Sequence, residues 1–155
     1  MENTKIDFLK HRFTALLRKL PSDTRAQWGK MTLQQMIEHF SDSVRISSGK
    51  TPFTDIMTPP EHLEKLRAFI LSDKPFRENT TNPLMSEVPA PVRTPSVKDA
   101  IIELEKELAY FFAVFEKNKL QVTRSPHFGD FNFEQNVHLL HKHARHHLRQ
   151  FGLDV

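Results

Sequence analysis

Apolar side chains recur every three or four positions along several stretches of the chain, and this spacing predicts amphipathic helices. The first stretch covers residues 4–20 and ends at Pro21. The second begins after Thr32, where Gln35 completes a capping-box pattern, and it ends at Gly49, a natural C-terminal stop. Two long helices are therefore predicted in the first third of the chain.

Three further helices are predicted in the rest of the chain. Residues 60–73 carry apolar positions along one side of a shorter helix. Ser96 with Asp99 forms another N-terminal capping signature, and the helix that follows is expected to end near Asn118. The last helix is expected over about residues 133–151. Four long helices, one extra short helix and no convincing strand predict an all-α fold, most economically a four-helix bundle.

Residues 74–95 separate the short helix from the next long one, and they cannot form a long helix because each interior proline removes a backbone donor. The prolines of this segment are Pro75, Pro83, Pro89, Pro91 and Pro95. We expect a long extended crossover along the surface, which would allow the second and third long helices to run parallel. The flanking segments are too short for separate cores, so residues 1–155 are predicted to form one domain. A loop is expected over 119–132, with Asn132 capping the last helix.

Composition excludes several classes of protein. The chain has no cysteine, which excludes a disulfide scaffold, a cysteine-ligated zinc finger, an iron–sulfur cluster and a thiol nucleophile. Its net charge is +3, with basic residues mixed among acids, so a nucleic-acid partner is not expected. No apolar run approaches the roughly 20 residues that span a bilayer, and the N-terminus has no apolar signal core. We therefore expect no membrane partner and a cytoplasmic location.

Histidine is in excess, with nine in the chain and five of them between residues 138 and 147. His143 and His147 are the only histidines spaced four apart, so on a helix they lie on one face, one turn apart. A helical wheel places both within the apolar arc of the last helix. His39, at the edge of the buried stripe of the second helix, is the best candidate for a third metal ligand. Three neutral imidazoles suit Zn²⁺, Ni²⁺, Fe²⁺ or Mn²⁺ and leave positions open for water or substrate.

An interpretation without a metal site stays open, because a histidine pair spaced four residues apart also arises by chance in a histidine-rich chain. The alternative to a metal site is a set of surface or hydrogen-bonded core histidines. The wheel places Asn136 and Gln150 in the inward arc and His141 at its boundary. The other polar residues of the last helix are expected to form a solvated basic face, with phosphate or anion contact as the alternative. That face comprises His138, Lys142, Arg145, His146 and Arg149.

Two stretches of the chain carry a resemblance to a known family. The first is Trp-Gly-Lys-Met-Thr at residues 28–32, followed by Gln-Met-Ile-Glu-His-Phe at 35–40. The second is His-Phe-Gly at 127–129, followed by HKHARHHLRQFG at 141–152. Together with the helix order and the proline-rich crossover, they make nearly the whole chain similar to the DinB/YfiT-like superfamily of metalloenzymes, and more narrowly to a bacterial branch of it.

The resemblance implies a DinB-like four-helix bundle with up-down-down-up topology. It also implies a divalent metal held by one histidine of the second helix and two of the last, which on this chain are His39, His143 and His147. Relatives include thiol-dependent S-transferases and isomerases, whereas some members lack ligands and have no known activity. Gln150 matches a polar position that follows the last histidine in many relatives, although Arg149 stands where a glycine often precedes it.

The function implied by the resemblance is metal-dependent transfer or hydrolysis on a small electrophilic molecule. Any low-molecular-weight thiol would be a co-substrate, because the chain has no cysteine. Gln150, Trp28 and His127 are candidate pocket residues; the last two could shape the pocket mouth or move a proton, with lid packing and backbone bonding as their alternative roles. A non-catalytic metal-binding bundle and an interaction module are the alternative functions. A homodimer is compatible with such a bundle, although no residue demands one.

Overall fold

The computed structural model describes residues 2–78 and 88–155, and within them the chain is mostly helical. The first three segments, residues 2–19, run on from one another and form the N-terminal rod. Three helices, a small hairpin and a last helix follow it. In chain order the elements are α1 (Glu2–Asp7), the π-helix η1 (Phe8–Arg12), α2 (Phe13–Lys19), α3 (Leu33–Ser48), α4 (Pro60–Leu71), α5 (Val97–Lys117), β1 (Thr123–Ser125), β2 (Gly129–Phe131) and α6 (Phe133–Gln150).

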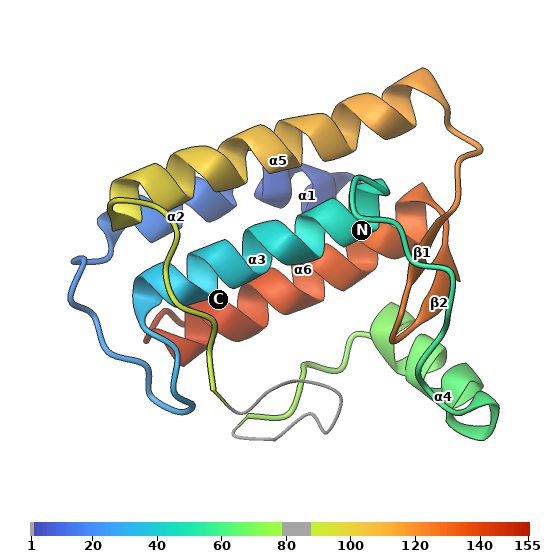
Figure 1. Ribbon diagram of the computed structural model, residues 1–155, viewed down its shortest axis with the longest axis horizontal. Helices are drawn as coiled ribbons and strands as arrows, with labels where there is room; N and C mark the ends of the chain where they lie inside the picture. Colours follow the sequence, from blue (N-terminus) through green and yellow to red (C-terminus); the bar gives the residue numbers. More distant parts are fainter. Residues whose placement is uncertain (1, 79–87) are drawn as a thin grey trace.

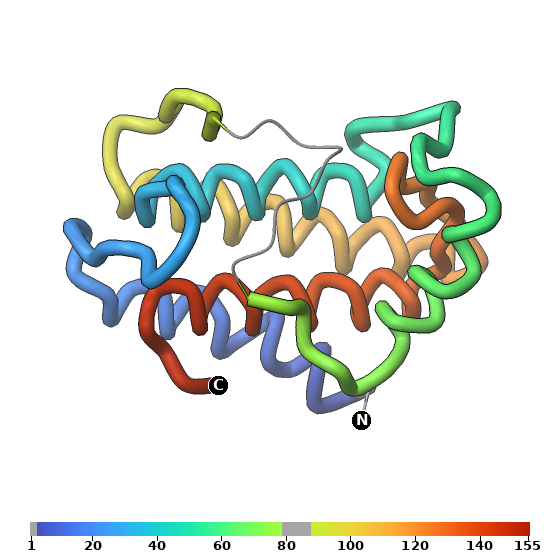
Figure 2. Tube along the Cα trace, turned by 90° about the horizontal axis from the view of Figure 1, so that it is seen from below, coloured from blue at the N-terminus to red at the C-terminus, as the bar shows by residue number. Residues whose placement is uncertain are grey.

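Four helical rods lie side by side and share one long direction (Figure 1). The N-terminal rod and α6 run one way, and α3 and α5 run the other way, as both views show (Figures 1 and 2). The second and third rods are therefore parallel, as the long crossover between them allows. The short helix α4 and the hairpin of β1 and β2 lie together at one end of the bundle.

The N-terminal rod was expected to be a single helix over 4–20, and it contains one widened turn. The N–H of Phe13 donates to the carbonyl of Phe8, five residues back, which defines a π turn. The rings of Phe8 and Phe13 consequently stack, with centroids 6.2 Å apart. The wider turn therefore places two aromatic side chains, five positions apart, on the face that meets the core.

The predicted helix boundaries are confirmed where a side chain caps them. Thr32 and Gln35 form a reciprocal capping box at the start of α3, and Asn132 forms another with Gln135 at the start of α6. The Ser96 side chain accepts the Asp99 N–H at the start of α5. These caps satisfy backbone N–H groups that the first turn of a helix leaves unpaired, so their sequence signatures locate the starts of the three helices.

Within the described residues, the inward faces of the four rods form one apolar core. Its largest fully buried side chains include Phe13, Phe40 and Phe111, one from each of three rods. Leu140 and Leu148 contribute the buried face of α6. In the described part of the chain, no helix is both long and apolar enough to cross a bilayer.

The expectation of a loop without strands over 119–132 is wrong. β1 and β2 pair antiparallel, with Thr123 opposite Phe131 and Ser125 opposite Gly129. The Thr123 hydroxyl donates to the carbonyl of Ser47 at 2.8 Å, which ties the hairpin to the end of α3. Strands of three residues are too short to give a visible alternation of apolar and polar positions, so the sequence pattern did not reveal them.

The crossover between α4 and α5 contains no helix in the parts described, residues 74–78 and 88–95. Residues 79–87, with Pro83, lie outside the described residues. The second described part is fastened to α3: the main-chain N–H groups of Arg93 and Thr94 donate to the Glu38 carboxylate at 2.9 and 3.1 Å. The crossover thus reaches the bundle at the residue next to His39.

Candidate metal centre

The bundle brings together the three histidines expected to bind metal, although they lie on two different helices. His39 comes from the middle of α3, and His143 and His147 lie one turn apart on α6. The Nε2 atom of His143 is 3.3 Å from Nε2 of His39 and 2.7 Å from Nε2 of His147. One nitrogen from each ring lies within 4.8 Å of the others. Antiparallel packing of α3 on α6 therefore converts two distant sequence segments into one cluster.

The chemistry of this cluster fits a divalent transition metal. The Nε2 atom of His143 approaches two other ring nitrogens, and a neutral imidazole offers at most one N–H, so a proton on that atom serves only one of the two approaches. Metal–nitrogen bonds of about 2.0–2.1 Å in a tetrahedral site separate the ligand nitrogens by roughly 3.3 Å. The His39–His143 separation already has this value, and the His143–His147 separation is shorter. Opening the His143–His147 pair would bring it to the same separation.

All three imidazoles favour the neutral form that binds metal. Burial lowers the pKa of His39, only partly opposed by the charge of Asp42. The pKa values of His143 and His147 lie well below the ordinary range, first because both rings are desolvated and then because neighbouring histidines would repel a second charge. At neutral pH each ring therefore presents a lone pair rather than a second proton.

Gln150 orients one of the three rings. His147 is 5% exposed, and its Nδ1 lies 2.7 Å from Oε1 of the buried Gln150. Because an amide oxygen only accepts, Nδ1 carries the proton and Nε2 is left with its lone pair facing the cluster. The Gln150 Nε2 in turn donates to the carbonyl of Trp28 at 2.9 Å. Gln150 and Trp28, two of the expected pocket residues, thus lie beside the cluster and are joined to His147 by two successive hydrogen bonds.

The loop before α3 is shaped to approach the end of α6 closely. Gly29 has φ of +79°, and a Cβ there would lie 2.9 Å from the Gln150 side chain. The N–H of Gln27 donates to the carbonyl of Gln150 at 2.8 Å. The Gln27–Gly29 segment therefore both caps the last turn of α6 and holds the glutamine that orients His147.

We expect Gln150→Ala to weaken the binding of Zn²⁺ about 10–100-fold, the usual cost of losing a group that orients a histidine ligand. The substitution removes the acceptor of the His147 Nδ1 proton, so the ring loses its fixed tautomer. Competition with a chromophoric chelator measures the affinity. Gln121→Ala, in the segment between α5 and β1, is the control and should keep it. Equal affinities of the two variants would contradict this role for Gln150.

Aromatic side chains surround the cluster. The ring of Phe40 lies 4.8 Å from His143, centroid to centroid, and Phe76 lies 6.3 Å from the same ring. His146 sits between Trp28 and Phe76, at 5.5 and 5.6 Å, and 5.2 Å from His147. The surroundings of the cluster are therefore apolar on several sides, and such surroundings strengthen electrostatic interactions inside a site.

Phe76 and Glu38 lie near the cluster, and no pattern in the sequence marks either as a site residue. Phe76 lies in the proline-rich crossover, where no periodicity marks an inward position. Glu38 is buried beside His39 and receives hydrogen bonds from Arg93, Thr94 and Gln34. Burial opposes its ionisation, but these hydrogen bonds outweigh burial and hold the pKa of Glu38 below its ordinary value. A buried carboxylate on a helix with partners on a distant loop leaves no local sequence signal.

His127, the remaining candidate pocket residue, lies in the hairpin turn rather than in the cluster. Its N–H donates to the Ser125 hydroxyl at 3.1 Å, and its carbonyl accepts the Thr58 hydroxyl at 2.6 Å. Its ring packs against Phe128, with centroids 6.1 Å apart. Among the described residues, no ring or hydrogen-bond contact joins it to the three histidines. These hydrogen bonds come from the main chain of His127, and its ring Nδ1 is buried without a hydrogen-bond partner among the described residues.

The basic face of α6 was expected to be solvated, and this expectation is wrong. Lys142 is only 8% exposed, and its ammonium donates to the main-chain oxygens of Ser72 and Lys74. α1 and α4 both pack against α6 and cover this side. The other four members of the face are half-buried, namely His138, Arg145, His146 and Arg149. A helical wheel cannot show that aperiodic segments cover a polar face.

We expect acid to destabilise the metal-free chain. The folded pKa values of His143 and His147 lie below the ordinary value of about 6.5 that both regain on unfolding. As the pH falls below that value, the unfolded state binds protons that the folded state does not. Each of these histidines then lowers the free energy of unfolding by up to about 1.4 kcal/mol per pH unit.

Urea unfolding of the chelator-treated protein between about pH 7.5 and 5.5 measures this slope. His143→Gln should make the dependence shallower, because one titrating ring is removed from the cluster. His62→Gln, at an exposed position of α4, should leave it unchanged. An unfolding free energy that stays constant or rises on acidification is the contrary result.

Comparison of the chain with protein-family models, with curated proteins and with solved structures gives no match. The chemistry of the site therefore rests on the geometry of its own residues.

Proposed function

We propose that the protein holds one divalent transition metal between α3 and α6 and uses it on a small electrophilic substrate. The observation that carries this proposal is the convergence of three imidazole nitrogens, one each from His39, His143 and His147, within 4.8 Å. Three protein ligands leave coordination positions for water or substrate, which is the arrangement of a catalytic rather than a purely structural site. Zn²⁺, Ni²⁺, Fe²⁺ and Mn²⁺ all suit the imidazole set.

We further propose that the chain is a member of the DinB/YfiT-like superfamily. The directions of the four rods support this, because the first and last run opposite to the second and third (Figure 1). The positions of the two resembling stretches support it as well. The segment 28–32 lies against the end of α6 through Gln150, and the stretches 35–40 and 141–152 carry the three histidines of the cluster.

The reaction we propose is transfer of a thiol sulfur, or of water in hydrolysis, to the electrophile. A divalent ion supplies Lewis acidity, which lowers the pKa of a thiol or water that reaches it. The thiol sulfur forms a bond to the electrophilic carbon, the leaving group departs with its bonding electron pair, and the thiol proton passes to solvent. Gln150 keeps the His147 lone pair aimed at the cluster, and the apolar rings of Phe40, Phe76 and Trp28 limit the access of bulk water.

Metal content and thiol consumption test the proposal together. The untagged chain is stripped with chelator and reloaded in turn with Zn²⁺, Ni²⁺, Fe²⁺ and Mn²⁺, and elemental analysis counts the ion. Loss of glutathione or bacillithiol in the presence of an aryl chloride then measures turnover. About one ion per chain with metal-dependent turnover supports the proposal. Absence of a bound ion contradicts it, and an ion without turnover favours a non-catalytic metal-binding bundle.

A further inference from the structure

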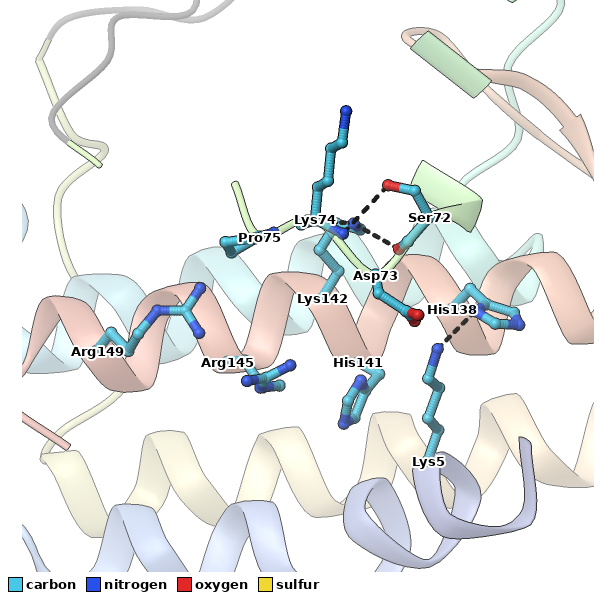
Figure 3. A pocket seen from close by; sticks show the side chains of 10 residues that line it. All are labelled: Lys5, Ser72, Asp73, Lys74, Pro75, His138, His141, Lys142, Arg145 and Arg149. Atoms are coloured by element: carbon cyan, nitrogen blue, oxygen red, sulfur yellow. Dashed lines mark hydrogen bonds between the residues drawn. The ribbon is translucent and has the colours of Figure 1, made fainter. Parts of the chain in front are cut away.

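A cavity of about 200 Å³ lies between α6, the N-terminal rod and residues 72–75. Its lining is strongly cationic (Figure 3). The charged members are Lys5, Lys74, Lys142, Arg145 and Arg149, against one acid, Asp73. Cations from three separate segments of the chain thus gather around one small space.

Neighbouring acidic side chains offset this positive charge only in part, through Asp73 near Lys142 and through Glu78 and Asp154 near Arg149. Among the described residues, none of the five cations has a side-chain carboxylate oxygen within ion-pair distance. Lys5 donates to Nδ1 of His138 at 2.7 Å, and Lys142 donates to main-chain oxygens. Arg145 and Arg149 donate to the main-chain oxygen of Val155 at distances of 3.0 to 3.3 Å. The acceptors of Lys5 and Lys142 are neutral and leave those two charges in place, whereas Arg145 and Arg149 share the terminal oxygen of Val155.

Several donors remain for a ligand. A guanidinium has five N–H groups and an ammonium has three. Arg145 uses two of its nitrogens and Arg149 one in contacts with Val155. Lys74 makes no side-chain hydrogen bond to a described residue, and in Figure 3 its side chain extends away from α6. The lining therefore combines fixed cations with free hydrogen-bond donors.

The cavity is separate from the histidine cluster. Arg145 lies roughly 200° around α6 from His143 at about 100° per residue, so the two sites occupy opposite faces of one helix. None of the three clustered histidines lines the cavity. Binding at one site therefore does not require the other to be loaded.

We propose that this cavity binds a phosphate-type dianion, either inorganic phosphate or a small phosphomonoester. Five cations against one acid match a doubly charged anion better than a monocarboxylate. Arginine forks and lysine ammonium groups are the usual protein partners of phosphate oxygens. The volume is below the roughly 300–1,000 Å³ of sites for drug-sized ligands, so a small anion fits better than a nucleotide.

Calorimetric titration of the chelator-stripped chain with inorganic phosphate tests the proposal at a fixed ionic strength of about 0.15 M. We expect one binding site per chain, with affinity reduced about tenfold or more in Lys5→Gln/Arg145→Gln. The matched control is Lys10→Gln/Lys106→Gln, which removes the same charge from two exposed positions and should bind as the unaltered chain does. The single variants Lys5→Gln and Arg145→Gln should each show a smaller loss, and they replace the pair if it fails to fold.

Four results would contradict the cavity site. No binding to the stripped chain, or undiminished binding to the Lys5/Arg145 variants, overturns the proposal. Equal losses in the control pair indicate non-specific attraction by net charge and also overturn it. Phosphate that binds only after metal loading is bound at the histidine cluster, which rejects the cavity and leaves the metal proposal standing.

Two further titrations identify the source of the anion. Glycerol phosphate binding more tightly than inorganic phosphate assigns a small phosphomonoester, and equal affinities assign free phosphate. Acetate binding as tightly as phosphate would contradict the preference for a dianion.

Discussion

Replacement of His147 by alanine is expected to reduce bound Zn²⁺ from about one ion per chain to nearly none. In the proposed site the substitution removes one of three protein ligands and leaves His39 and His143 unable to close it. Loss of a group that merely orients a ligand costs 10–100-fold in affinity, so loss of the ligand itself should cost more than about 100-fold. Elemental analysis after dialysis against a weak chelator measures the change. His143→Ala should behave in the same way, because both rings lie in the cluster.

His138→Ala is the matched control for these variants. It also removes a histidine from α6, but from the side that faces Lys5 rather than the cluster. Its metal content should equal that of the unaltered chain. Retention of the ion in both His143→Ala and His147→Ala would refute the assignment of the three ligands.

Phe40→Ala is expected to lower the free energy of unfolding by about 3–5 kcal/mol, the usual cost of deleting a fully buried aromatic ring. Phe40 is fully buried, and its ring packs against Phe13 and against His143, with centroids 4.7 and 4.8 Å apart respectively. Its loss leaves a cavity in the core beside His143. Chemical denaturation of the metal-free chain measures the effect without a contribution from the ion.

The comparison variant is Phe53→Ala, which removes the same ring from a position that is 37% exposed. Its effect should be clearly smaller, because most surface substitutions change stability by less than about 0.5 kcal/mol. A loss of less than about 1 kcal/mol in Phe40→Ala would show that the surrounding rings refill the space.

Features that depend on local sequence could be predicted well. The caps at Thr32, Ser96 and Asn132 act through residues three positions away, so short patterns were enough to locate three helix starts. The inward direction of His143 and His147 follows from helical periodicity alone. Local rules therefore gave the helices and two members of the cluster.

Features that depend on packing between distant segments could not be predicted in the same way. The hairpin is held by pairing across a turn and by the contact of Thr123 with Ser47, and neither has a periodic signature. Phe76 and Lys142 owe their positions to the aperiodic segment after α4. Their burial is a property of how that segment lies on α6, and a helical wheel contains no information about it.

The separation of the histidines along the chain has a consequence for folding. His39 and His143 are 104 residues apart, and the chain has no cysteine with which to form a disulfide. An ion shared by these two side chains would act as a reversible crosslink that closes most of the polypeptide into a loop. A permanent crosslink across about 100 residues removes unfolded-chain entropy worth about 4–5 kcal/mol in the simplest model. Metal supply would then set how long each molecule survives unfolding and proteolysis, in addition to whether its site can react.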